Sequence, residues 1–156
     1  MFFSAKELSY LKTQRLGQIA TVSKDLQPDV APVSFEFDRK YFYTGSMMMA
    51  RTFRYKNIVR GNVKVAFVVG DSESVDPWKP RAIKIHGGAG LISRDGAAGF
   101  GIYIRITPEV KWSLGIDEPA FKNRQPVIRK IANAPQSLLD SGVRKAIVRT
   151  SVQNTC

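Results

Sequence analysis

A two-residue alternation of apolar and polar side chains restricts the fold of this chain more than any other feature. In residues 29–38 (DVAPVSFEFD), Val33, Phe35 and Phe37 point to one side of an extended backbone, with polar residues between them. Residues 81–92 alternate in a similar way. Such a period predicts half-buried strands. Because helices do not alternate regularly with these strands, we expect a small antiparallel barrel with peripheral helices rather than a parallel sheet.

The other elements are predicted from turn residues, helix formers and β-branched residues. Ser4 and Glu7 have the spacing of a capping box, which predicts a helix over residues 4–14. A proline-free segment predicts a second helix over 50–60. The composition of residues 70–80 (GDSESVDPWKP) predicts a loop. The predicted strands are 18–23, 29–38, 41–44, 63–69, 81–92 and 101–114, the last interrupted at Pro108. We expect the second and third of these strands to form a hairpin.

The chain length and a change of composition near residue 117 define the expected domain organisation. With 156 residues, the chain has the length of one domain. Residues 120–156 contain seven basic residues, one acidic residue and two prolines. We therefore expect a barrel domain over residues 3–117 and a basic C-terminal extension of unknown structure over 118–156. This extension would serve as a mobile tail or docking arm, with a short helix at 137–146.

Several classes of protein are excluded by the residues that the sequence lacks. No apolar run approaches the ~18–20 residues of a membrane-spanning helix, and the first residues do not resemble a secretory leader. The single cysteine is the last residue, Cys156, and the single histidine, His86, has no paired carboxylate nearby. We therefore expect neither a disulfide framework nor a metal site. These features favour a cytoplasmic location.

A cluster of cations is the strongest functional signal that the residues themselves give. A predicted strand ends at Gly45 and Ser46, and the helix after it contains Arg51, Thr52 and Lys56. Cations near the start of a helix oppose its dipole, and a bound phosphate would compensate them. The net charge of +11 also suits an anionic partner. From the residues alone, a phosphate site and a solvent-exposed basic helix both remain open.

Five stretches of sequence follow one another in an order that is typical of one family. They are RLGQIATVSKDLQPDVAPVSFEFD, YTGS, ARTFRYKNIVRGNVKVAFVVGD, SVDPWKPRAIKIHGGAGLI and IRITPEVKWSLGID. This order resembles the pyridoxamine 5′-phosphate oxidase-like split-barrel superfamily, and within it the branch that uses the deazaflavin coenzyme F420. The resemblance covers Phe3 to about Asp117. It implies a mainly β fold, a six-stranded antiparallel split β-barrel with peripheral helices, and a homodimer with the cofactor at the subunit interface.

The resemblance also implies which residues form the cofactor site. They surround the tricyclic ring, the phosphate and the anionic tail of a flavin-type cofactor. The implied residues are Pro32, Val33, Gly45 and Ser46 beside the ring, Arg51, Thr52 and Lys56 at the phosphate, Trp78 and Arg81 in a loop that covers the site or binds the tail, and Trp112 reaching the ring from the other subunit.

These features predict an oxidoreductase that transfers a hydride between a flavin-type cofactor, coenzyme F420 or FMN, and a small unsaturated substrate. The cofactor would supply the redox chemistry, which explains why the sequence shows no acid–base pair. Two alternatives remain open: a flavin-binding or carrier protein without turnover, and a nucleic-acid-binding protein. Residues 122–156 contain no aromatic residue among their cations, which argues against binding to single-stranded nucleic acid.

Overall fold

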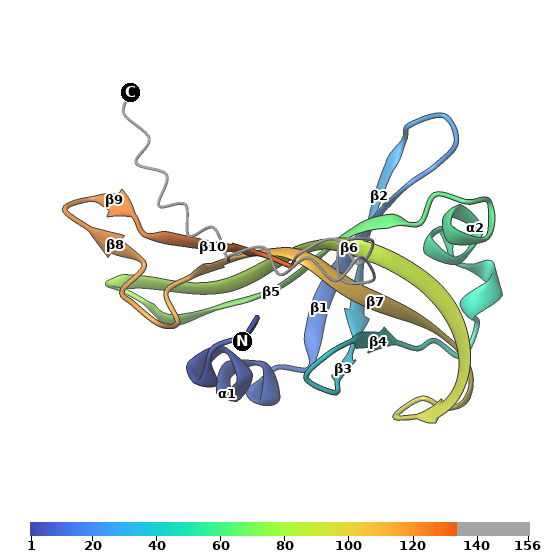
Figure 1. Ribbon diagram of the computed structural model, residues 1–156, viewed down its shortest axis with the longest axis horizontal. Helices are drawn as coiled ribbons and strands as arrows, with labels where there is room; N and C mark the ends of the chain where they lie inside the picture. Colours follow the sequence, from blue (N-terminus) through green and yellow to red (C-terminus); the bar gives the residue numbers. More distant parts are fainter. Residues whose placement is uncertain (134–156) are drawn as a thin grey trace, which may run out of the picture.

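The computed structural model describes residues 1–133, which form a curved antiparallel sheet with two α-helices outside it (Figure 1). In chain order the elements are α1 (Ala5–Thr13), β1 (Leu16–Val22), β2 (Pro28–Ser34), β3 (Glu36–Phe37), β4 (Phe42–Thr44), the 3₁₀ turn η1 (Met49–Arg51), α2 (Phe53–Val59), β5 (Lys64–Val75), β6 (Trp78–Gly96), β7 (Gly99–Leu114), β8 (Phe121–Lys122), β9 (Gln125–Pro126) and β10 (Ile128–Ala132). None of the helices in this part of the chain is both long and apolar enough to cross a membrane.

The main sheet has the strand order β2-β1-β5-β6-β7-β4-β3, and β10 pairs with β7 beside this path. All of these pairs are antiparallel. The predicted mainly β, antiparallel architecture is therefore confirmed, with more strands than the six expected. One reason is that the predicted strand 29–38 divides at Phe35: β2 pairs with β1, whereas only β3 forms the expected hairpin with β4.

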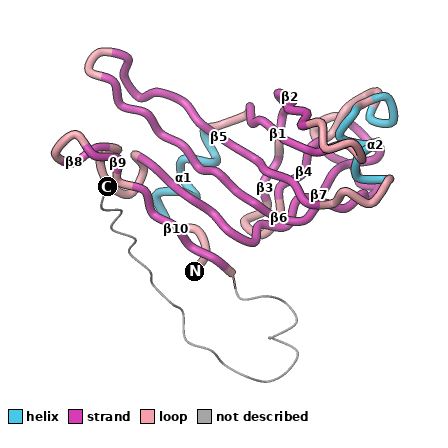
Figure 2. Tube along the Cα trace, turned by 90° about the horizontal axis from the view of Figure 1, so that it is seen from above, coloured by secondary structure: helices cyan, strands magenta, loops and turns pink. Residues whose placement is uncertain are grey.

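The loop prediction for residues 70–80 is wrong, because β5 and β6 continue through it to a tight turn at Asp76 and Pro77. These strands pair from Lys64 to Val75, with one register shift between Ser72 and Ser74. Ladder hydrogen bonds join backbone groups, so a strand of polar residues can pair when its partner is already in place. Figure 2 shows the resulting hairpin extending away from α2.

The interruption predicted at Pro108 is also absent, since β7 runs through this residue. A register shift between His86 and Gly87 on β6 lies opposite it. A Cβ atom at Gly87 would collide with the carbonyl oxygen of Thr107. The sheet therefore accommodates Pro108 through a bulge that requires glycine on the neighbouring strand.

Both predicted helices are present, and polar side chains define their starts. Ser4 caps α1: its Oγ accepts the Glu7 N–H at 3.1 Å, and its own N–H donates to Glu7 Oε2 at 2.8 Å. This confirms the capping box. The predicted helix 50–60 is divided into η1 and α2 by Thr52, whose extended backbone and Oγ1 cap α2 by accepting the Tyr55 N–H at 3.2 Å.

Aromatic and β-branched side chains fill the core between the sheet and α1. Phe42 and Phe67 are fully buried with their rings 5.2 Å apart, and Phe37 stacks on Phe42 at 4.2 Å. The fully buried isoleucines are Ile19, Ile83, Ile85, Ile104 and Ile106. These residues occupy the inward positions of six strands, as the alternation in the sequence predicts.

A buried ion pair joins α1 to β7. The Nζ of Lys111 donates to Oε2 of Glu7, and both side chains are fully buried. Burial lowers the pKa of Lys111, while the Glu7 carboxylate opposes that shift. Ser4, which caps the same helix, donates from Oγ to Asp117 at 2.7 Å. Two polar contacts therefore fix the first helix to the end of the sheet.

The segment after Ile116 is more ordered than its composition predicts. The strands β8 and β9 form a short hairpin, and β10 pairs with β7 from Ile128 opposite Leu114 to Ala132 opposite Val110. Part of the extension expected as a mobile tail or docking arm therefore forms strands, over residues 121–132. The helix predicted at 137–146 lies outside the described residues.

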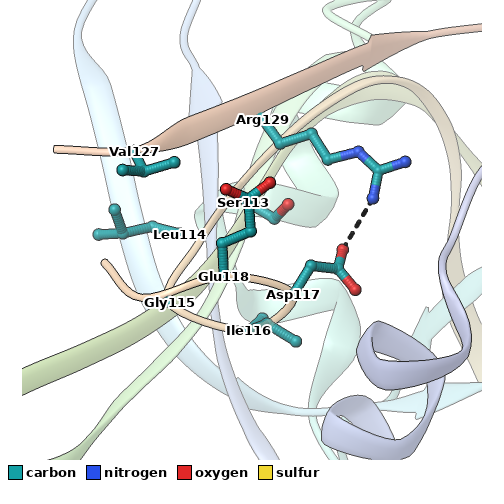
Figure 3. A pocket seen from close by; sticks show the side chains of 8 residues that line it. All are labelled: Ser113, Leu114, Gly115, Ile116, Asp117, Glu118, Val127 and Arg129. Carbon is teal, nitrogen blue, oxygen red and sulfur yellow. Dashed lines mark hydrogen bonds and ion pairs between the residues drawn. The ribbon is translucent and has the colours of Figure 1, made fainter. Parts of the chain in front are cut away.

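A small hollow lies between residues 113–118 and β10 (Figure 3). Its volume of about 10 Å³ leaves room for no more than one water molecule. At its edge, Arg129 Nη1 and Asp117 Oδ2 form an ion pair at 3.0 Å. This hollow is part of the packing of β10, and it is too small for a ligand.

Candidate functional site

The basic segment that follows β4 carries three cations that form no ion pair among the described residues. The side chains of Arg51 and Lys56 are exposed, and among the described residues neither forms an ion pair. Between them in the sequence, Arg54 is half-buried, and its Nε has no hydrogen-bond partner within residues 1–133. Burial lowers the pKa of Arg54, and the charge of Asp29 opposes that shift. An anion bound here would supply the partner that these cations lack.

Gly45 and Ser46 connect β4 to this basic segment at a point of close packing. A Cβ atom at Gly45 would lie 2.6 Å from the ring of Tyr103, so glycine is required for this approach. The Oγ of Ser46 accepts the Met48 N–H at 3.3 Å, which shapes the turn toward η1. The small residues predicted to lie beside a cofactor ring therefore lie next to the cations.

Pro32 and Val33 lie on β2, and their side chains point in opposite directions. Val33 belongs to the core and is 5% exposed, whereas Pro32 is exposed and pairs with Gln18 on the outer face of β1. Only Pro32 therefore presents its side chain to a ligand on this face.

An open groove lies between residues 46–51 and 98–103, with a volume of about 460 Å³. It contains Ser46 and Arg51, which the sequence predicted as site residues. It also contains residues that sequence reasoning missed: Met47, Met48, Met49, Ala50, Ala98, Gly99, Phe100, Gly101, Ile102 and Tyr103. The signal available in the sequence was a run of methionines and two large apolar residues within a glycine-rich turn.

Trp78 and Arg81 lie at the other end of the molecule from α2, on the projecting β5–β6 hairpin (Figure 1). Arg81 donates to both carboxylate oxygens of Asp71, at 2.9 and 2.7 Å. Its charge is therefore neutralised within the chain. Trp78 is 60% exposed, and its ring lies 5.6 Å from that of Phe121. A single copy of the chain does not bring these two residues to the groove.

Trp112 lies on the outer face of the sheet among basic side chains. The Nζ atoms of Lys84 and Lys130 lie 4.3 and 5.4 Å from the centre of its indole ring. His86 meets the same ring edge-on at 4.7 Å. These contacts place Trp112 on β7 apart from the groove, within a basic patch of the sheet. No cluster of three or more potential metal ligands occurs in the described part of the chain.

The Arg81–Asp71 contact leads to a prediction about acid stability. Hydrogen bonds from Arg81 hold the pKa of Asp71 below its ordinary value of 3.8. The stabilisation that depends on this ionised carboxylate is therefore complete above about pH 4 and is lost as the pH falls through the lowered pKa. We expect Asp71→Asn to be less stable than the parent near neutral pH and to lose less stability on acidification. Urea unfolding midpoints across the acid range measure both effects.

An Asp25→Asn variant is the matched control for this experiment, because Asp25 is an exposed turn residue. It should keep the acid dependence of the parent. Equal acid dependence in Asp71→Asn and the parent would contradict the assignment of this stabilisation to Asp71.

Comparisons with known proteins agree with the geometry of the fold. Residues 4–106 match the family model described as pyridoxamine 5′-phosphate oxidase. A relative from Streptomyces rimosus, named 5a,11a-dehydrotetracycline/5a,11a-dehydrooxytetracycline reductase, is 39% identical over 98 residues, which cover 62% of this chain and 68% of the relative.

Solved structures with low sequence identity share the fold. The General Stress Protein 26 of Bacillus anthracis superposes with a TM-score of 0.57 at 16% identity, covering 81% of this chain and 96% of that protein. An FAD-binding protein of Mesorhizobium loti superposes with a TM-score of 0.53 at 20% identity, covering 71% and 91% respectively. At these identities the likeness concerns the fold alone.

Proposed function

Because the chain belongs to the pyridoxamine 5′-phosphate oxidase family, we propose that it is an oxidoreductase that uses a flavin-type cofactor to reduce a small unsaturated substrate. The reductase name of the Streptomyces rimosus relative supports this reaction type, and the name of the Mesorhizobium loti protein supports a flavin. The observation in this chain that carries the proposal is the basic segment 51–56, in which no ion pair is formed by the exposed Arg51 and Lys56 among the described residues, together with the groove that Arg51 lines.

The cations of this chain suit the phosphate of such a cofactor. Arg51 and Lys56 would donate charge-assisted hydrogen bonds to the phosphate oxygens, and the unpartnered Nε of Arg54 would gain an anionic neighbour. When bound, the cofactor supplies the hydride, while the chain binds and orients both reactants.

We propose FMN and coenzyme F420 as the two candidate cofactors. Both carry a phosphate that Arg51 and Lys56 can bind. The deazaflavin also carries an anionic tail, which would need further cations. Because Arg81 is neutralised by Asp71, we propose that the patch formed by Lys84, Trp112 and Lys130 on a second subunit provides them.

A homodimer would bring the separated candidate residues together. The outer positions of β1 and β5 carry the small apolar residues Ala20, Ala66 and Val68, where a solvated sheet face normally carries polar ones. This face continues across the sheet to Lys84 and Trp112. We propose that two copies pair through it, so that Trp112 of one subunit approaches the cofactor of the other.

We expect the protein to sediment as a dimer at low micromolar concentration. Replacing Ala66 by glutamate would introduce a charge into the proposed contact and should shift the population to monomer. Glu73→Lys, a charge change on the exposed hairpin, is the control and should leave the dimer intact. A folded parent monomer in analytical ultracentrifugation would contradict the dimer.

The proposed activity is tested by identifying what the purified protein binds. Heat-released small molecules can be analysed by mass spectrometry, and the protein can be titrated with FMN and with the deazaflavin. Turnover is then followed by oxidation of the reduced cofactor in the presence of unsaturated compounds. Binding of either cofactor without turnover of any such compound would favour the carrier alternative, and binding of neither would overturn the proposal.

A further inference from the structure

The groove between residues 46–51 and 98–103 has an apolar rim that solvent reaches freely. Met47 is 95% exposed, Met48 58%, Phe100 81% and Ile102 41%. These residues come from two segments about fifty positions apart in the sequence, and they line one groove. An exposed apolar cluster around a concave surface is typical of a ligand site.

The polar side chains of this groove are few, and the Tyr103 hydroxyl is already committed to the protein. The hydroxyl of Tyr103 donates to the Gly99 carbonyl at 2.9 Å and accepts the Ala98 N–H at 3.0 Å. The Oγ of Ser46 accepts the Met48 N–H. Arg51 is the one charged residue in the lining, and the proposed cofactor phosphate would neutralise it. A ligand of this groove would therefore be bound mainly through apolar contact.

The wall formed by residues 96–101 is held in place before any ligand binds. Glu36 accepts hydrogen bonds from Arg94 Nη1 at 3.0 Å and from the Ala97 N–H at 3.1 Å. The guanidinium of Arg94 lies 4.2 Å from the ring of Tyr43 and 5.2 Å from that of Tyr103. These contacts fix the β6–β7 turn to β3 and β4, and the backbone of Phe100 pairs with that of Asp95 beside this turn.

The opposite wall is adaptable. The side chains of Met47 and Met48 are unbranched and exposed, and methionine adjusts to ligands of different outline. An aromatic ring and flexible thioethers that line one groove favour flat apolar molecules over polar ones. The volume of about 460 Å³ lies within the range of sites for drug-sized ligands, for which ~300–1,000 Å³ is usual.

We propose that this groove binds the substrate through a neutral, apolar, fused-ring body, which lies between Phe100 and the methionines Met47 and Met48. A flavin ring system is a poorer fit, because its polar edge needs several hydrogen bonds, whereas the Ser46 hydroxyl is the one neutral side-chain donor left in the lining. That the bound molecule is the substrate rests on the proposed function. Whether the groove binds a neutral, apolar, fused-ring molecule can be tested independently of that function.

Nile red, a neutral fused-ring dye whose fluorescence rises in apolar surroundings, is a suitable probe. We expect the purified protein to bind it at micromolar concentration, and saturating FMN to leave this affinity unchanged. Phe100→Ser and Met48→Ser should each weaken dye binding, Phe100→Ser by about ten-fold or more, while FMN affinity stays at the parent value. Phe121→Ser, which removes an exposed aromatic ring outside the groove, should have no effect on either ligand.

The possible outcomes separate this proposal from the proposed function. Displacement of the dye by FMN would overturn the proposal, because the groove would then hold the cofactor. The proposal would also be overturned if Phe121→Ser lost as much dye affinity as the groove variants. The same holds if Phe100→Ser and Met48→Ser lost no dye affinity. If neither FMN nor the deazaflavin binds while the dye titrations give the expected pattern, the proposed function fails and the apolar site stands.

Discussion

Replacing Lys111 by alanine should lower the free energy of unfolding by about 3–5 kcal/mol, because it leaves the carboxylate of Glu7 buried without its cation. This is a large fraction of the ~5–15 kcal/mol by which domains are usually stable. The midpoint of thermal unfolding should fall by roughly ten degrees. Urea and thermal denaturation followed by circular dichroism measure both changes.

Two variants show whether this loss arises from the unpaired charge. Replacing both residues at once, Glu7→Leu with Lys111→Met, should recover most of the stability, because two apolar side chains fill the same space without a buried charge. Lys6→Ala removes an exposed cation from the same helix and should have a small effect. A Lys111→Ala protein as stable as the parent would show that the pair contributes nothing.

Removing the cations at the proposed phosphate site should produce the largest change in cofactor affinity. Each charge-assisted hydrogen bond contributes about 1.5–3 kcal/mol. Arg51→Ala with Lys56→Ala should therefore weaken FMN binding by roughly two to four orders of magnitude, and Lys56→Ala alone by roughly one to two. Titration of apoprotein, followed by the quenching of flavin fluorescence, gives these affinities.

The control for this series is Arg60→Ala, which removes the exposed cation at the C-cap of α2, one turn beyond Lys56. It should leave FMN affinity near the parent value. All of these variants should have the same urea unfolding midpoint as the parent. An equal decrease in FMN affinity in all variants, the control included, would indicate a general effect of net charge. Unchanged affinity in the double variant would remove Arg51 and Lys56 from the site.

Local interactions explain which elements the sequence could predict. The capping box of Ser4 and Glu7 lies within four residues, so its spacing alone defines the start of α1. The inward side chains of β6, such as Ile83 and Ile85, follow from the two-residue period. These features can be predicted without knowing which strands pair with each other.

Other features depend on partners that are far away in the sequence. Residues 70–80 have a loop-like composition and become strand because two backbone segments pair. The groove could not be predicted, since it joins residues 46–51 to 98–103 across several strands. The partner of Arg81 could not be predicted either, because only the register between β5 and β6 places Asp71 opposite it. This pairing argues against Arg81 as a ligand-binding residue.

The contacts that anchor α1 also set the order in which the chain can fold. Glu7 is separated from Lys111 by 104 positions, and Ser4 from Asp117 by 113. During synthesis, the first helix emerges early and must wait for the end of β7 before these contacts can form. The entropy of closing so long a loop has to be offset by the hairpins already assembled between them. We therefore expect the Glu7–Lys111 and Ser4–Asp117 contacts to form late in folding, and the N-terminal core residues Phe3 and Leu11 to stay open to aggregation until then.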